Sequence, residues 1–286
     1  MENKELARLN VTLPLDGNQV VIKYELSPHY LTHQYIHSAV KAGKMYEELV
    51  SRFLIKVIKK GDVFIDIGAH IGFFSLFVSC LTRDEGQVFS IEPNNENFEW
   101  LQNHIKINQR KNIIPLNVVV SEIDGEVYFF TNSDNDGGHA LWDPGKHPFN
   151  KISKDQPEKN LVPSARLDTL VKENEIKTCK VVKIDTEGAE YTILKSGENF
   201  FRPENVSFIV CEMNETGLHH LGVSQYELRA LMQRKGYETF IFPKDDHIPI
   251  LVPNKTMLNS PYVHNVLFTT QEKLSEHWPT VTPYPE

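Results

Sequence analysis

The chain has 286 residues, of which 40% are apolar and 24% charged, so it has room for one large domain with a core of ordinary size. Its net charge of −8 disfavours a nucleic-acid partner, because binding a phosphate backbone requires clustered lysine and arginine. Its longest apolar stretch, 73–81, is too short to cross a bilayer. Three cysteines lie scattered in apolar surroundings and no basic start precedes an apolar run, so we expect a cytoplasmic protein with reduced thiols and no membrane partner.

Residues 1–58 form an N-terminal extension in this interpretation. Polar and apolar residues alternate on both sides of Asp16-Gly17-Asn18, which is a hairpin signal. Apolar residues then recur at helical spacing, which predicts a helix over 34–58. We expect this extension to help cover the acceptor site, because it lies outside the repeating part of the chain.

From residue 59 to 286 strands alternate with helices. The patterns predict strands at 63–67, 87–92, 113–120, 181–185, 207–212, 237–242 and 263–269, with helices at 72–81, 95–108, 167–174, 188–196 and 224–235. Parallel neighbours need crossover helices, so this order predicts an α/β domain with a doubly wound, mostly parallel seven-stranded sheet. A further strand is expected at 126–131. Residues 132–164 lack periodicity and are rich in Gly, Pro, Asn and Asp, which predicts a long functional loop.

The first strand of the domain runs straight into Gly68-Ala69-His70-Ile71-Gly72, and a helix begins at once. Glycines let the backbone turn tightly and approach a ligand at a helix N-terminus. Dinucleotide sites use the spacing G-x-G-x-x-G, whereas this loop has G-x-x-x-G and is preceded by Asp66. That carboxylate would repel a pyrophosphate and attract the ammonium and sulfonium of S-adenosylmethionine. The loop therefore favours S-adenosylmethionine, and an NAD-dependent oxidoreductase is the alternative.

Glu92 ends the next strand, 20 residues after Gly72, where an acid can accept hydrogen bonds from ribose hydroxyls, and Pro93 then turns the chain away. The predicted cofactor-binding residues of these two strand ends are Asp66, Gly68, Ala69, His70, Gly72, Phe73, Glu92 and Pro93.

Four stretches together resemble the FkbM family of methyltransferases. They are residues 63–74, Ser90-Ile-Glu-Pro-Asn94, residues 116–125 and the most specific block, Lys183-Ile-Asp-Thr-Glu-Gly-Ala-Glu190. His70 stands where the family usually has Asn. The resemblance implies a class I, Rossmann-like methyltransferase that uses S-adenosylmethionine, usually for O-methylation of sugars or natural products. It also implies that the third strand end lies near the adenine, which adds Val119 and Ser121 to the cofactor residues.

Three acids follow two later strands and should meet at the same sheet edge. They are Asp185, Glu187 and Glu212, and like charges raise one another's pKa, so one of them could act as a general base toward an acceptor hydroxyl. Asp185, Glu212 and Asn214 also offer oxygen ligands of the kind that Mg²⁺ or Ca²⁺ prefers. The sequence leaves open whether a metal takes part, and whether the protein is instead a cofactor-binding scaffold that transfers no methyl group.

Overall fold

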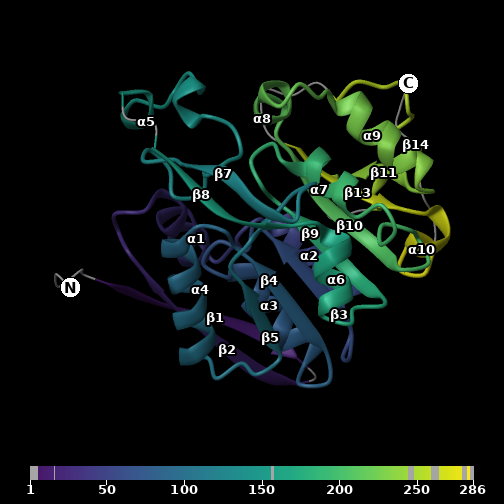
Figure 1. Cartoon of the computed structure of the whole chain (residues 1–286). Helices are drawn as coiled ribbons and strands as arrows, with labels where there is room; N and C mark the ends of the chain where they lie inside the picture. Colours follow the sequence, from purple (N-terminus) through teal and green to yellow (C-terminus); the bar gives the residue numbers. More distant parts are fainter. Residues whose placement is uncertain are drawn as a thin grey trace.

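The computed structural model describes residues 6–15, 17–155, 158–243, 248–258, 264–278 and 282–283. A mixed sheet with the order β14-β12-β11-β13-β10-β9-β3-β4-β5 forms the centre of the molecule (Figure 1). Its strands are β3 (Val63–Ile67), β4 (Gln87–Ile91), β5 (Ile113–Leu116), β9 (Cys179–Ile184), β10 (Val206–Met213), β11 (Glu238–Ile241), β12 (Ile250–Leu251), β13 (His264–Thr269) and β14 (Thr282–Pro283). The α/β prediction is confirmed. The sheet is mixed, and the described residues add β12 and β14 to the seven strands expected.

The large sheet has a parallel part and a part in which strand direction reverses at each of three successive pairings. From β10 to β5 all neighbours are parallel, which places the carboxyl ends of β10, β9, β3 and β4 at one edge. On the other side β13 pairs antiparallel with both β10 and β11, and β11 pairs antiparallel with β12. The parallel half carries the strand ends of Asp66, Glu92, Asp185 and Glu212, whereas Val119 and Ser121 lie at a separate, smaller sheet.

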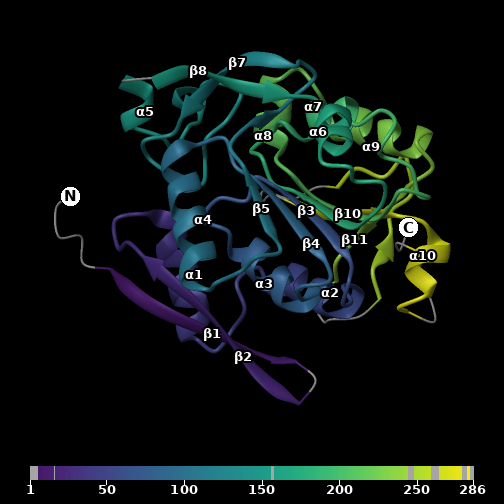
Figure 2. The ribbon, with the colours of Figure 1, turned by 60° about the horizontal axis from the view of Figure 1, so that its bottom comes forward.

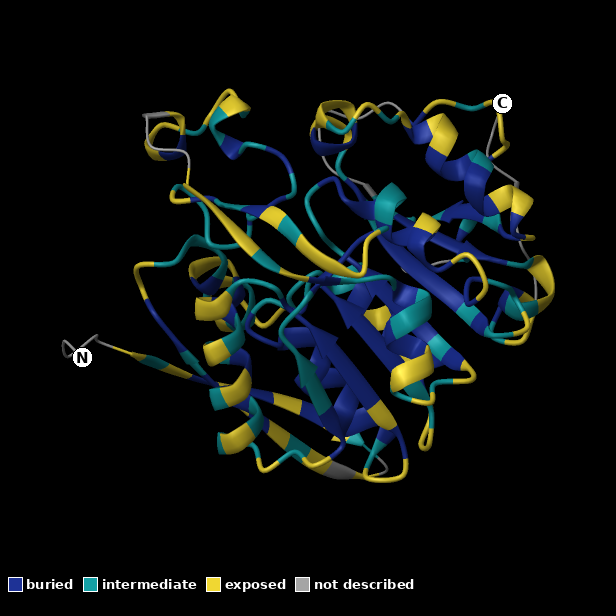
Figure 3. Ribbon diagram, in the orientation of Figure 1, coloured by how far each residue is buried: buried dark blue, intermediate teal, exposed yellow. Residues whose placement is uncertain are grey.

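Both faces of the sheet are buried. Successive side chains of a strand point to opposite faces, and on each face they belong to a hydrophobic core. Phe64, Val181 and Phe208 belong to the core on one face, whereas Ile65, Val182 and Ile209 belong to the core on the other. Figure 3 shows the sheet as a buried layer between partly exposed helices. This arrangement explains why these strands have nearly continuous apolar sequences.

Helices cover the two faces in separate groups (Figure 2). The first face carries α2 (Glu48–Val57), α3 (Phe73–Thr82) and α4 (Asn95–Ile107), and the second carries α6 (Leu167–Glu173), α7 (Glu190–Ser196) and α9 (Gln225–Arg234). Two short helices, α8 (Glu215–His220) and α10 (Gln271–Ser275), follow β10 and β13. Every residue of α3 is buried, so this helix forms the centre of the first core. Among the described residues, no helix is both long enough and apolar enough to cross a membrane.

The N-terminal segment forms a hairpin and two helices. Strands β1 (Ala7–Leu15) and β2 (Asn18–Leu26) pair antiparallel, as the turn signal predicts, although Asp16 lies outside the described residues. The single helix expected over 34–58 is instead α1 (Leu31–Lys41) followed by α2. Gly43, with a φ of 72°, stands just after the end of α1, and Glu47, with a φ of 42°, precedes α2. This break brings Glu47 to the edge of the large sheet.

A second, three-stranded sheet with the order β6-β8-β7 lies beside the first. Its strands are β6 (Val119–Val120), β7 (Gly125–Thr131) and β8 (Glu158–Ala165), so the strand expected over 113–120 divides between the two sheets. The unbroken loop expected over 132–164 instead contains η1 (Pro144–Lys146), α5 (Ile152–Asp155) and most of β8. Because β8 is mostly exposed and contains Pro163, its sequence lacks the apolar alternation by which strands are recognised.

Candidate functional site

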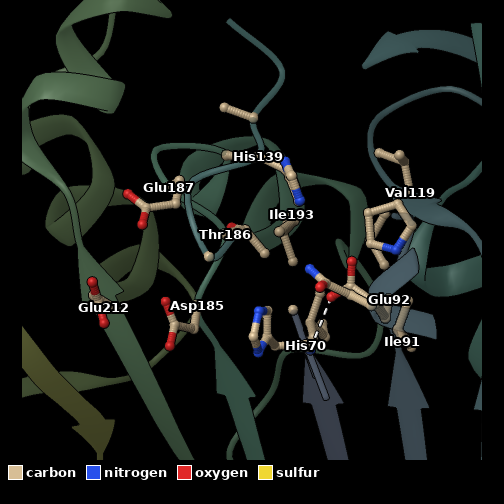
Figure 4. Close-up of a pocket in the computed structure, with 18 of the residues that line it drawn as sticks. His70, Ile91, Glu92, Val119, His139, Asp185, Thr186, Glu187, Ile193 and Glu212 are labelled. Carbon is tan, nitrogen blue, oxygen red and sulfur yellow. Dashed lines mark hydrogen bonds between the residues drawn. The ribbon is translucent and has the colours of Figure 1, made fainter. Parts of the chain in front are cut away.

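A cavity of about 310 Å³ lies at the carboxyl ends of the parallel strands, and we call it the central cavity. Side chains from α1, from the segment after it and from the 132–164 segment complete its wall. Figure 4 shows two distinct ends. We call them the glycine-loop end, formed by Gly68, His70, Ile91, Glu92 and Val119, and the acid end, formed by Glu47, Asp185, Glu187 and Glu212.

The glycine-loop end depends on backbone shapes that other residues cannot adopt freely. Gly68 has a φ of 83°, and a Cβ atom at this position would lie 1.9 Å from the backbone oxygen of Asp185. Gly72 also has a φ of 83°, and its Cβ would lie 2.4 Å from Leu101. The two glycines therefore allow β3 to turn into α3 while β9 and α4 approach closely.

Glu92 is 5% exposed and organises this loop. Its Oε2 accepts a hydrogen bond from the backbone N–H of His70 at 2.8 Å, and its Oε1 accepts one from Asn94 at 2.8 Å. Burial raises the pKa of Glu92, which the nearby His70 and these backbone bonds partly offset. Each carboxylate oxygen keeps a further lone pair with which to accept a ligand hydroxyl.

Asp66 lies behind the cavity wall and does not line the cavity. It is 1% exposed, its Oδ2 accepts a hydrogen bond from the Ser75 hydroxyl at 2.6 Å, and its Oδ1 has no hydrogen-bond partner within the described part of the chain. Burial raises the pKa of Asp66, and Lys183 opposes that effect. Asp66 can therefore affect a ligand in the cavity only through the glycine loop that separates the two, and not by direct contact.

The predicted cofactor residues divide into two groups. Gly68, His70, Glu92, Pro93 and Val119 line the cavity, whereas Asp66, Ala69, Gly72, Phe73 and Ser121 lie outside its lining. Ser121 bonds the Ser164 hydroxyl at 2.7 Å, which joins β6 to β8, and Phe73 packs against Tyr24 and Tyr46. Ser121 and Phe73 thus contact other parts of the protein and do not line the cavity.

Both the backbone and the side chain of Glu187 are held at the acid end. Its φ is 54°, its backbone oxygen accepts a hydrogen bond from the Trp142 indole at 2.6 Å, and its Oε2 accepts one from the Asn214 amide at 2.5 Å. Burial, followed by the nearby Asp185, raises the pKa of Glu187 to about 7. The result is a fixed carboxyl group that changes charge near neutral pH.

A buried ammonium group lies beneath the acid end. Lys183 Nζ is 2.6 Å from Asp185 Oδ2 and 3.9 Å from Glu47 Oε1, and it stands 4.6 Å from the centre of the Phe74 ring. The side chain is 3% exposed, and although burial alone would lower the pKa of Lys183, the carboxylates of Asp185 and Glu47 hold it well above its usual value. Lys183 and Asp185 are two residues apart, so strand alternation is the sequence signal that could have paired them.

Glu47 is the acid-end residue that sequence reasoning missed. One carboxylate oxygen each from Glu47, Asp185 and Glu212 lies within 4.8 Å of the other two. Burial raises the pKa of Glu47 to about 7 and that of Glu212 well above its usual value. Because a single helix is predicted over 34–58, Glu47 is not expected to reach the sheet edge. Gly43, a residue typical of helix ends, was the available signal for the break.

Asn214 does not take the place expected for a metal ligand. It caps α8, where its Oδ1 accepts a hydrogen bond from the backbone N–H of Gly217 at 2.9 Å, and its amide nitrogen is engaged by Glu187. Asn214 lies outside the cavity lining, and Glu47 stands near Asp185 and Glu212 in its stead.

Sequence comparison relates this chain to known proteins. The family described as "Methyltransferase FkbM domain" matches residues 66–239. The hexuronic acid methyltransferase AglP of Haloferax volcanii is 26% identical over 196 residues, which are 68% of this chain and 71% of that protein.

Among solved structures, the methyltransferase FkbM of Methylobacillus flagellatus KT aligns with a TM-score of 0.43 at 13% identity, covering 83% of this chain and 54% of that one. Fibrillarin of Aeropyrum pernix aligns with a TM-score of 0.44 at 10% identity, covering 91% of this chain and 81% of that one. Both scores are too low to support an argument, so the assignment rests on the sequence match.

Proposed function

The chain belongs to the FkbM methyltransferase family and is an S-adenosylmethionine-dependent methyltransferase, and from this premise we propose that it O-methylates a hydroxyl group of a saccharide acceptor. The observation that carries the proposal is one cavity that joins a glycine loop to a rigidly held carboxyl group, that of Glu187. The saccharide class is suggested by the related protein, which is named as a hexuronic acid methyltransferase.

The residues at the glycine-loop end fit S-adenosylmethionine. Gly68 leaves no side chain between the loop and Asp185, the orphaned Oδ1 of Asp66 adds negative charge behind the loop, and Glu92 retains lone pairs for ribose hydroxyls. We propose that His70, Ile91, Pro93 and Val119 form the remaining walls around the nucleoside. The negative charge of Asp66 behind the loop complements the ammonium and sulfonium of this cofactor.

S-adenosylmethionine, when bound, supplies a methyl group on a positively charged sulfur. The protein must then hold the acceptor oxygen in line and remove its proton. We propose Glu187 as the general base, since its pKa of about 7 suits proton transfer at neutral pH and Asn214 fixes its carboxyl group. Asp185 and Glu212 would orient the acceptor by accepting hydrogen bonds from its other hydroxyls.

Metal activation is the second mechanism compatible with acid residues at this edge. The ammonium of Lys183, however, already faces the carboxylates of Asp185 and Glu47, so a divalent ion between them would meet a positive charge at short range. We therefore assign proton removal to the carboxyl groups. Metal-stripped protein should retain its activity, and activity restored only by Mg²⁺ or Ca²⁺ would contradict this assignment.

We propose that the segments outside the βα core shape the acceptor entrance. Thr32 and Tyr35 of α1 and Asn135, His139 and Leu141 of the 132–164 segment line the cavity. Tyr35 is 59% exposed, so it can contact a sugar ring without supporting the core. A Tyr35→Ala variant should raise the acceptor KM while leaving the Kd for S-adenosylhomocysteine unchanged.

The family assignment gives no support to the NAD-dependent alternative or to a scaffold without activity. The direct test is transfer of a labelled methyl group from S-adenosylmethionine to a panel of saccharides, beside calorimetric titration with S-adenosylhomocysteine. We expect cofactor binding together with labelled saccharide product carrying the methyl group on oxygen. Cofactor binding without transfer to any saccharide would contradict the proposed acceptor class.

A further inference from the structure

Acidic side chains dominate the charged lining of the central cavity, which also contains two histidines, His70 and His139. Its acidic lining residues are Glu47, Glu92, Asp185, Glu187 and Glu212, and no lysine or arginine is found among the described residues of the lining. The nearest ammonium, that of Lys183, is 3% exposed, lies outside the lining and is engaged by Asp185. A ligand in this cavity therefore meets carboxyl groups without meeting a fixed side-chain cation.

Four of the five acids lie at the acid end. They come from four places in the fold: the residue before α2, the end of β9, the turn that follows it and the end of β10. S-adenosylmethionine has one more positive than negative charge and Lys183 adds a second, whereas the acid end holds four carboxyl groups. Burial and mutual repulsion already raise the pKa of Glu47 and Glu187 to about 7 and that of Glu212 well above its usual value, so an anion placed among them would require further protonation. An anionic group in this space would be repelled, most strongly where water is excluded.

Unpaired polar atoms at this end point to the same conclusion. Glu47 Oε2 and Asn265 Oδ1 are buried oxygens of cavity-lining residues, and neither has a hydrogen-bond partner within the described part of the chain. The Asn265 oxygen is a hydrogen-bond acceptor, and the neighbouring Glu47 carboxyl group is one in its ionised form, so a ligand group that donates hydrogen bonds suits both. Hydroxyl and ammonium groups donate hydrogen bonds, whereas an ionised carboxylate, sulfate or phosphate cannot.

We propose that the sugar unit occupying the acid end presents hydroxyl or ammonium groups and carries no anionic group. This inference rests on the proposed saccharide O-methylation and narrows it to neutral sugars and amino sugars. The acceptor then differs in charge from the one named for the related protein, a hexuronic acid. Glu47 acts here as a specificity-determining residue that rejects anions.

The test compares matched sugars under the same conditions. Methyl glycosides of gluco, galacto and manno configuration are each supplied as the neutral sugar, the 2-amino sugar and the uronic acid, with labelled S-adenosylmethionine and the metal-stripped wild-type protein. We expect kcat/KM for the best neutral or amino sugar to exceed that of its uronic acid at least tenfold. An equal or higher value for the uronic acid, with or without added Mg²⁺, overturns the inference.

If no member of the set accepts methyl while S-adenosylhomocysteine still binds, the saccharide proposal itself fails, and the inference that rests on it falls too. A second arm uses Glu47→Gln, which should raise the relative rate with the uronic acid at least threefold and leave the Kd for S-adenosylhomocysteine within twofold. Glu173→Gln is the control, because Glu173 is an exposed acid of α6 outside the cavity lining and should leave the ratio unchanged. An unchanged ratio of uronic acid to neutral sugar rates in Glu47→Gln would show that Glu47 does not determine specificity against anions.

Discussion

The two ends of the central cavity are assembled in different ways. The glycine-loop end comes mainly from two consecutive strand ends, at Gly68–His70 and Ile91–Pro93, and its hydrogen bonds join backbone N–H groups to one acid, Glu92. The acid end collects Glu47, Asp185, Glu187 and Glu212 from across the chain, with a buried ammonium beneath them. The proposed cofactor binding therefore depends on local backbone shape, whereas the proposed chemistry depends on long-range packing.

The largest effect should come from the buried cation. Lys183→Met would leave Asp185 and Glu47 without their ammonium partner, and breaking a buried pair in this way costs about 3–5 kcal/mol. We expect a loss of that order in the free energy of unfolding, measured by urea denaturation. Lys180→Met, on the same strand but with its ammonium over the Phe208 ring, should cost far less. Equal losses in the two variants would show that Lys183 does not support the acid end.

The backbone of the glycine-loop end can be tested by adding one methyl group. Gly68→Ala combines an unfavourable φ with a clash against Asp185, which together should cost about 3 kcal/mol. Gly61→Ala is the matched control, because Gly61 has a φ of 87° and nothing within 4 Å of the added Cβ, so only about 1–2 kcal/mol is expected. Thermal unfolding measures both, and similar losses would mean that close approach to β9 has no role.

Removing the proposed base should impair methyl transfer at the acid end without impairing cofactor binding at the glycine-loop end. Glu187→Gln keeps the size of the side chain but cannot accept a proton, so kcat should fall about 100-fold or more while S-adenosylhomocysteine binds as before. Labelled methyl transfer under saturating acceptor gives kcat. Nearly full activity in this variant would mean that another carboxyl group, such as that of Asp185 or Glu212, is the general base.

A smaller effect is expected when Glu187 loses its hydrogen bond from Asn214. A base must be ionised to act, so activity should fall as the pH drops through the pKa of Glu187, about 7. The Asn214 amide favours the ionised form and lowers this pKa, so Asn214→Ser, which can still cap α8, should move the midpoint of the kcat/KM profile upward by about 0.5–1 pH unit. A uniform loss of activity at an unchanged midpoint would assign Asn214 a structural role alone.

The same comparison explains what the sequence predicts well and what it misses. The glycine loop and Glu92 could be identified because their signal is local, with two glycines and an acid at fixed spacing on consecutive strand ends. Glu47 could not, because it reaches the acid end only through the break between α1 and α2, and Lys183 is recognised only once its depth beneath the cavity is known. The strand β8 escaped for a related reason, since its exposed and polar residues leave no periodic pattern.

Calorimetric titration of S-adenosylhomocysteine into the wild type, Glu92→Ala and Glu187→Gln can show whether one end of the cavity binds the cofactor and the other performs the chemistry. We expect Glu92→Ala to weaken binding tenfold or more, about 1.4 kcal/mol, and Glu187→Gln to leave the Kd within twofold. A folded Glu92→Ala protein with unchanged affinity, or a Glu187→Gln protein weakened as much as Glu92→Ala, would contradict this division of roles.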